Sequence, residues 1–390
     1  MSFFVDLGWK SLNKYEEELC GDKVEILNTE DSSILILADG MGSGIRANIL
    51  ATLTAKIAGT LFAKGVALEE IVETIASTLP VSSVNGVAYA TFSILQIFRD
   101  GRGYLVEYDN PNCIFLRNKK AAELPFREQT LSGKVIRESM FQVQPGDAYI
   151  LMSDGTIYCG VGDIMNYSWD RDSMAAYAEK CVSTTGSASR MANLLIDACN
   201  DLYGQIPSDD TTIAVARIKE EQIVSIFTGP PQNPEDDGCC VREFMAVPGK
   251  KIISGGITGK IASRELGREL TPDTGALDPE IPPVSHMAGI DLVTEGVVTL
   301  HRVVQLLEQY TAEEVDVSFF EELNKDNGAC QMVRILMEDC TTVYLFVGCG
   351  INEAYQHKNM PFDVTARQNL VKRLIAVLEK MQLRVVVEYY

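Results

Sequence analysis

The sequence predicts an α+β protein built from two folding units. The chain has 390 residues, whereas a single domain usually has about 100–200. Up to residue 218 the hydrophobic pattern changes from strands to helices and back to strands, and after it strands and helices alternate, which is typical of an α/β domain. We place the boundary at the all-polar segment 219–222, and expect domains at 1–218 and 219–390.

The composition supports a globular protein and excludes several classes of function. Hydrophobic residues make up 46% of the chain and charged residues 23%, enough apolar material for real cores. The formal net charge is −20, which argues against a surface that binds nucleic acid or anionic lipid. No apolar run approaches the roughly 18 residues of a membrane span, and the start resembles no signal peptide. We therefore expect a cytoplasmic protein, with no membrane or nucleic acid as partner.

In the first domain, the apolar run 34–37 predicts a buried strand that ends at Asp39-Gly40. Apolar residues then recur every four positions and predict a helix that buries this face: Ile45, Ile49, Leu53, Ile57 and Leu61. A second helix is predicted from the spacing of Leu68, Ile71, Val72, Ile75 and Leu79, with its end at Pro80.

A strand hairpin follows, because Asp100-Gly101 separates the apolar segments 89–98 and 103–108. The rest of this domain is predicted as a strand at 148–152, a helix at about 189–203 and a last strand at 211–218.

In the second domain we expect strands near Ile252, at 343–347 and at 385–387, with helices near 261–270, 297–309 and 365–381. The Pro/Gly-rich segments 229–238 and 271–283 are predicted as loops. Glycines follow the strands at 252–259 and 345–350, where exposed amides at a helix start could bind a phosphate-bearing ligand or phosphopeptide. Simple strand-to-helix turns explain these glycines better, since such glycines are common and neither segment completes a nucleotide-binding motif.

Aspartates fall at the ends of the predicted strands in the first domain. Asp39 and Asp154 follow strands, Asp209 precedes one, and Asp22 comes shortly before the first of them. Carboxylates gathered in one place repel each other unless a cation lies among them, and Mg²⁺ or Mn²⁺ prefers oxygen ligands. The alternative to a metal site is that the Asp-Gly pairs simply form turns.

The scarcity of histidine narrows the chemistry further. The three histidines all lie in the last third of the chain, so the first 220 residues cannot build a Ser-His-Asp or Cys-His mechanism. The ten cysteines form no C-x-x-C pair, so we expect reduced thiols rather than a zinc cluster or disulfide framework.

Four ordered motifs in residues 1–218 resemble the SpoIIE-type serine/threonine phosphatases, a branch of the metal-dependent PPM (type 2C) protein phosphatases. The motifs are Cys20-Gly21-Asp22, Ala38-Asp39-Gly40-Met41-Gly42-Ser43-Gly44, Met152-Ser153-Asp154-Gly155 after Pro145-Gly146-Asp147, and Ser208-Asp209-Asp210-Thr211-Thr212. The resemblance implies an α-β-β-α sandwich, two antiparallel sheets flanked by helices, with two Mn²⁺ or Mg²⁺ ions at one edge.

The resemblance also implies roles for individual residues. Asp39 would bridge both ions, the Gly40 carbonyl and Asp22 would hold one, and Asp154 and Asp209 the other. Asp39 and Asp154 would thus be the catalytic residues, and a water between the ions would attack phosphorus. Asp210 stands where many relatives have Asn and would support the ligands from behind. Two departures are Met41, where eukaryotic relatives have His, and the lack of an Arg before Asp22, where only Lys10 and Lys14 occur.

The function predicted on this basis is hydrolysis of phosphoserine or phosphothreonine on a signalling phosphoprotein, such as an anti-sigma-factor antagonist-like protein, by a chain that could form a homodimer. The second domain would be regulatory, or would bind a partner or ligand. The alternative from another class is a weakly active or inactive phosphatase-fold protein that binds a phosphoprotein or acts as a sensor. A third hypothesis makes residues 219–390 an independent enzyme.

Overall fold

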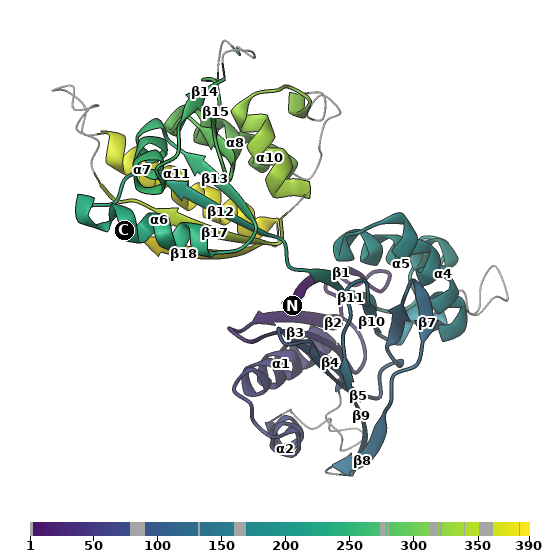
Figure 1. The fold of residues 1–390 in the computed structure, drawn as a ribbon. Coiled ribbons are helices and arrows are strands. Elements are labelled where there is room, and N and C mark those ends of the chain that lie inside the picture. The colour runs from purple at the N-terminus through teal and green to yellow at the C-terminus, as the bar shows by residue number, and fades with distance from the viewer. Residues whose placement is uncertain are drawn as a thin grey trace. The chain divides into compact units, whose positions relative to one another are not determined.

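A computed structural model describes residues 3–78, 90–131, 133–159, 169–273, 278, 281–311, 319, 322–338, 340–350, 362–381 and 383–390, and for residues 362–366 the backbone alone. The chain divides into two compact units, Met1–Glu220 and Glu221–Tyr390, called unit 1 and unit 2 below (Figure 1). The division falls at the end of a strand, two residues after the boundary expected from the sequence.

Unit 1 contains two antiparallel sheets. The first has the strand order β1 (Phe3–Leu12), β11 (Thr211–Glu220), β10 (Ala148–Met152), β6 (Ile114–Arg117) and β7 (Lys120–Ala122). The second has the order β2 (Asp22–Asn28), β3 (Ser32–Gly40), β4 (Ala90–Phe98), β5 (Arg102–Tyr108), β9 (Lys134–Gln142) and β8 (Arg127–Leu131). The hairpin expected at Asp100-Gly101 joins β4 to β5.

Three layers of apolar contacts hold unit 1 together. The inner faces of the two sheets pack on each other through residues such as Leu37, Leu95, Tyr149 and Ala216. Helices α1 (Gly44–Ala63) and α2 (Leu68–Thr78) cover the outer face of the second sheet. The short helix α3 (Gly155–Tyr158) follows β10, and α4 (Arg171–Thr184) and α5 (Ala188–Leu202) cover the first sheet. The predicted α-β-β-α sandwich is confirmed.

Helix α1 forms where the sequence predicts it. The face expected to be buried is partly buried only at its C-terminal end, where Ile57 and Leu61 pack against the core, and is exposed before it. Ile45 is 65% exposed, Ile49 50% and Leu53 38%. The buried face consists instead mainly of small residues: Gly44, Ala47, Ala51, Thr54, Ala55, Ala58, Gly59 and Phe62. A Cβ at Gly59 would lie 2.5 Å from Leu27 Cδ1, so the helix lies too close to the sheet for large side chains on that face.

The buried face of α2, in contrast, was predicted correctly. Leu68, Ile71, Val72 and Ile75 are all buried. Leu79 and the expected stop at Pro80 lie outside the described residues.

Substitutions on α1 should therefore have effects opposite to those expected from hydrophobicity. We expect Ile49→Ser to change the free energy of unfolding by no more than about 0.5 kcal/mol, because the side chain is half exposed. Ala55→Leu should cost about 1–3 kcal/mol, because Ala55 is fully buried against the sheet. Both tryptophans, Trp9 and Trp169, lie in unit 1, so urea unfolding followed by tryptophan fluorescence measures this unit. The reverse ranking of the two variants would contradict the observed packing.

Unit 2 is built on a seven-stranded mixed sheet. Its strand order is β14 (Thr271–Pro272), β15 (Ser285–Met287), β16 (Ile290–Thr294), β13 (Lys250–Ser254), β12 (Ile223–Thr228), β17 (Thr342–Val347) and β18 (Arg384–Tyr389). The five strands from β16 to β18 are parallel, and β14 and β15 add an antiparallel edge.

Helices cover both faces of this sheet (Figure 1). Helices α6 (Asp237–Ala246) and α7 (Gly256–Leu266) pack on one face, and α8 (Val297–Tyr310), α10 (Gly328–Glu338) and α11 (Phe362–Lys380) pack on the other. The predicted second α/β domain is thus confirmed, as an open sheet with helices on both sides.

Several element boundaries differ from the prediction. The 3₁₀ turn η1 (Pro234–Asp236) and the start of α6 lie in the expected loop 229–238. Helix α7 begins at Gly256 and ends at Leu266, not at 261 and 270, because Gly267 adopts a left-handed conformation that stops the helix.

All ten cysteines are free, and most are buried. In the described part of the chain no helix has both the length and the apolar character needed to cross a bilayer.

Candidate metal centre

Strands β2 and β3 place two carboxylates side by side. Asp22 and Asp39 are directly opposite each other in the antiparallel register, a position in which side chains lie on one face and Cβ atoms are about 5 Å apart. Asp22 is 4% exposed. The second sheet therefore contributes a pair of acids at one end of the sandwich.

The first sheet contributes the other acids from the ends of β10 and β11. Asp154 follows β10 and begins the short helix α3, and Asp209 and Asp210 immediately precede β11. Ser153 connects the two sheets: its hydroxyl donates to Asp22 Oδ2 at 2.7 Å and accepts from the backbone N–H of Thr212 at 2.8 Å. This link brings the ends of β2, β10 and β11 together.

The carboxyl groups act on one another electrostatically. Burial, with the negative charges of Asp22, Asp154 and Asp209, raises the pKa of Asp39 to about 9. Burial is also the main reason that the pKa of Asp22 rises to about 7, although hydrogen bonds to its carboxylate oppose the shift. The pKa of Asp209 is raised by burial and by Asp154. The metal-free protein thus holds its carboxylates in an unfavourable state that a cation would relieve.

Two buried carboxylate oxygens in this group have no hydrogen-bond partner among the described residues, Asp22 Oδ1 and Asp210 Oδ2. The other oxygen of Asp210 accepts from the backbone N–H of Lys14 at 3.0 Å. A Cβ at Gly21 would lie 2.7 Å from Asp210 Oδ2, so only glycine leaves room beside that oxygen. Unmatched buried oxygens of hard carboxylates fit a hard divalent cation.

The protein alone does not complete a coordination shell. Within the described ranges, no three Asp, Glu, His or Cys side chains form a ready group of metal ligands. Water would have to supply the remaining ligands, as is usual for Mg²⁺, which gives up its hydration water reluctantly.

The comparisons identify the first unit by sequence. Residues 29–219 match the family model of Stage II sporulation protein E (SpoIIE). Unit 1 contains a SpoIIE-type phosphatase domain. The matched region includes Asp39, Asp154 and Asp209, and it begins after Asp22. No curated protein matches the chain.

Solved structures give distant similarities to the SpoIIE-type domain. The phosphatase domain of SpoIIE from Bacillus subtilis with a fragment of its regulatory domain is 21% identical, with a TM-score of 0.47, and covers 56% of this chain and 64% of its own. The RsbU and RsbW domains of a Mycobacterium tuberculosis protein are 17% identical, with a TM-score of 0.47. The match covers 63% of this chain and 70% of that structure's chain. RsbX in complex with magnesium is 19% identical, with a TM-score of 0.40. The match covers 55% of this chain and 96% of the RsbX chain.

Two glycines of the SpoIIE-type domain allow close approaches beside the acids. A Cβ at Gly40 would lie 2.0 Å from the carbonyl oxygen of Ala47, and one at Gly155 would lie 2.2 Å from that of Asp210. These positions require glycine because backbone from α1 or from the start of β11 lies against them.

Sequence reasoning missed two contributions to this site. The link through Ser153 depends on the docking of two sheets, which no local pattern reports, although Ser153 lies inside a quoted motif. Lys14 was noted only as a basic residue before Asp22, but its positive charge opposes the rise in the pKa of Asp209 that burial and Asp154 cause. Met41 follows Asp39-Gly40 and is 49% exposed.

Proposed function

We propose that unit 1 is a Mn²⁺- or Mg²⁺-dependent phosphatase that hydrolyses phosphoserine or phosphothreonine on a signalling phosphoprotein. The observation that carries the proposal is the gathering of Asp22, Asp39, Asp154 and Asp209 from both sheets at one end of a SpoIIE-type domain. Raised pKa values and unmatched carboxylate oxygens support a cation at this place.

Two ions would be held by different subsets of these groups. Asp39 would contact both ions; Asp22 and the carbonyl of Gly40 would hold one, and Asp154 and Asp209 the other. Ser153 would orient Asp22 through the hydrogen bond to its Oδ2, and a hydrogen bond that fixes a ligand in this way strengthens metal binding. Asp210 accepts a hydrogen bond from the backbone N–H of Lys14. It would support the metal ligands without contacting an ion itself.

Bound ions would supply an acidified water and neutralise negative charge on the phosphoryl oxygens. The chain itself has to orient the phosphate group and keep the carboxylates in place. Lys14 would contribute to this task, because its charge acts on Asp209. Unit 1 contains no histidine, so the leaving group would take its proton from water or from another side chain.

Metal dependence tests the proposal directly. The full chain is stripped with EDTA and then assayed with a phosphoserine peptide as Mn²⁺ or Mg²⁺ is added back. We expect hydrolysis to rise on the order of 10²-fold or more with metal, since the ions provide both the nucleophile and charge stabilisation. A phosphothreonine peptide should be hydrolysed as well.

Two results distinguish the alternatives. Binding of the phosphopeptide without metal-stimulated turnover would favour a phosphoprotein-binding module over an enzyme. Turnover that EDTA leaves unchanged would contradict a metal mechanism of any kind at these carboxylates.

A further inference from the structure

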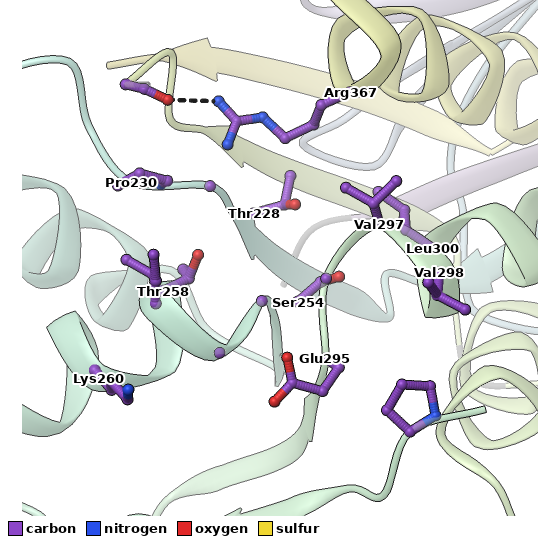
Figure 2. Close-up of a pocket in the computed structure, with 17 residues that line it drawn as sticks. Thr228, Pro230, Ser254, Thr258, Lys260, Glu295, Val297, Val298, Leu300 and Arg367 are labelled. Atoms are coloured by element: carbon purple, nitrogen blue, oxygen red, sulfur yellow. Dashed lines mark hydrogen bonds between the residues drawn. The ribbon is translucent and has the colours of Figure 1, made fainter. Parts of the chain in front are cut away.

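Unit 2 contains a cavity of about 620 Å³ at the carboxyl ends of its parallel strands (Figure 2). Thr228 at the end of β12 and Ser254 at the end of β13 line it, together with Glu295 after β16 and Gly350 after β17. In the sheet, β13 lies next to β12 on one side and β17 lies next to it on the other, so the direction in which strands are added reverses at β12. Open α/β sheets bind ligands at this kind of reversal, outside the carboxyl ends of the strands.

Two helices begin at the wall of this cavity. Helix α7 starts at Gly256 after Gly255, whose φ of 131° only glycine adopts readily, and α8 starts at Val297 after Gly296. Neither cap residue offers a side chain to the first amides of its helix. First-turn N–H groups that lack a capping side chain attract anions.

The buried hydroxyl group of Ser254 is independent evidence for a ligand, because it lacks a hydrogen-bond partner among the described residues. Ser254 is 1% exposed, and its Oγ makes no hydrogen bond to any residue that the structure describes. Figure 2 shows its side chain between Thr228 and Glu295, next to the start of α7. A buried polar group without a partner is costly, and an oxygen of a ligand in the cavity would satisfy this one.

The rest of the wall limits the kind of ligand. The carboxylate of Glu295 lies beside the same turn, since a Cβ at Gly256 would be 3.0 Å from both of its oxygens. A carboxylate repels phosphate but accepts hydrogen bonds from hydroxyl groups. Val297 and Val298, which are 40% and 56% exposed, add an apolar surface at the start of α8.

The loop after β17 is held in place by α11. Arg367 donates hydrogen bonds to the carbonyl oxygens of Gly348 at 2.9 Å and Gly350 at 3.0 Å. This side of the cavity is therefore fixed before any ligand arrives, which favours binding.

We propose that this cavity binds a nucleotide. Its phosphate would lie at the start of α7 with Ser254, the ribose hydroxyls would donate to Glu295, and the base would cover Val297 and Val298. A ligand with phosphate, hydroxyls and an apolar ring matches all three parts of the wall, and the volume lies in the range of small-molecule sites. The proposal does not depend on catalysis by unit 1.

Calorimetric titration of the full chain tests this proposal, with EDTA present so that no divalent ion links phosphate to the carboxylates of unit 1. The probes are ATP, GTP, NAD⁺, adenosine, guanosine and inorganic phosphate. We expect at least one nucleotide to bind with a Kd below about 100 μM, at least about tenfold more tightly than its nucleoside and than phosphate. Ser254→Ala should weaken that nucleotide about tenfold, the loss expected for a hydrogen bond to a charged group.

Two further variants separate the parts of the site. Glu295→Gln should weaken nucleotide and nucleoside but not inorganic phosphate, because it removes the charge that receives the ribose hydroxyls. Thr299→Val is the matched control. Thr299 is also buried, and its hydroxyl has no hydrogen-bond partner among the described residues, but it does not line the cavity, so binding should not change. The proposal is wrong if no nucleotide binds below about 1 mM, if phosphate binds as tightly as the nucleotides, or if Ser254→Ala and Glu295→Gln bind like the wild type.

Discussion

Replacement of Asp39 by Asn should lower kcat/KM for a phosphoserine peptide on the order of 10³-fold or more. The loss of a group that only orients a metal ligand costs about 10–100-fold, and Asp39 is proposed to contact both ions. Its carboxylate is opposite Asp22 and is acted on by the charges of Asp154 and Asp209. Steady-state kinetics at saturating Mn²⁺ measure the effect. Asp100→Asn is the matched control, because Asp100 lies in an exposed hairpin turn and bonds only locally to Arg102.

Thermal unfolding without metal keeps this test independent of catalysis. The pKa of Asp39 is raised from 3.8 to about 9, so the folded state retains a proton that the unfolded state has lost. Its contribution to stability is present below about pH 4 and is lost progressively as the pH rises towards about 9. At pH 8 the metal-free Asp39→Asn variant should therefore have a higher Tm than the metal-free wild type, and Mn²⁺ should raise its Tm much less. Equal activity, or an unchanged response to Mn²⁺, would rule out Asp39 as a ligand.

Replacement of Gly8 by Ala should destabilise unit 1 by about 3 kcal/mol. Gly8 is buried in β1, and a Cβ there would lie 2.2 Å from the backbone nitrogen of Ser189 and 2.6 Å from the carbonyl carbon of Ala188. Backbone atoms cannot rotate away as a side chain can, so α5 would have to move off the sheet. The same region contains a hydrogen bond from the Ala188 N–H to Asp6 Oδ2 at 3.0 Å, which the shift would also weaken. Urea unfolding followed by tryptophan fluorescence gives the magnitude.

Gly186→Ala provides the comparison for this substitution. Gly186 is exposed just before α5, and a Cβ there would meet no atom within 4 Å. We expect its stability to be unchanged or slightly increased, since alanine restricts the unfolded chain more than glycine does. If both variants lost the same stability, the close contact between β1 and α5 would not be the cause.

Much of the fold could be predicted because the strong signals are local. The Asp-Gly hairpin and the apolar strand before Asp39 are read from a few adjacent residues, and both are confirmed. The buried face of α1 could not be predicted in this way, because the large residues Ile45, Ile49 and Leu53 outweigh alanine in any pattern of hydrophobicity. The approach of α1 to the sheet, which selects its alanines and Gly59, is a property of packing between distant segments.

The candidate site shows the same limit. Aspartates at strand ends could be named from the sequence, because strand ends are recognisable and the motifs of the SpoIIE-type phosphatases occur in order. The register that sets Asp22 opposite Asp39 and the bond from Ser153 to Asp22 depend on how strands and sheets meet. In unit 2, the glycine turns were visible, but the cavity and the unmatched hydroxyl of Ser254 appear only when the strand order is known.

The hydrogen bond between Ser153 and Asp22 also bears on how unit 1 folds. It joins residues 131 positions apart, and the bond between Lys14 and Asp210 joins residues 196 positions apart. Contacts of such high sequence separation form late, after the loops between them have closed. The hairpin of β2 and β3 can pair Asp22 with Asp39 early, but the complete group of carboxylates exists only once both sheets have docked. Occupancy of the proposed metal site would therefore report that the two sheets have docked.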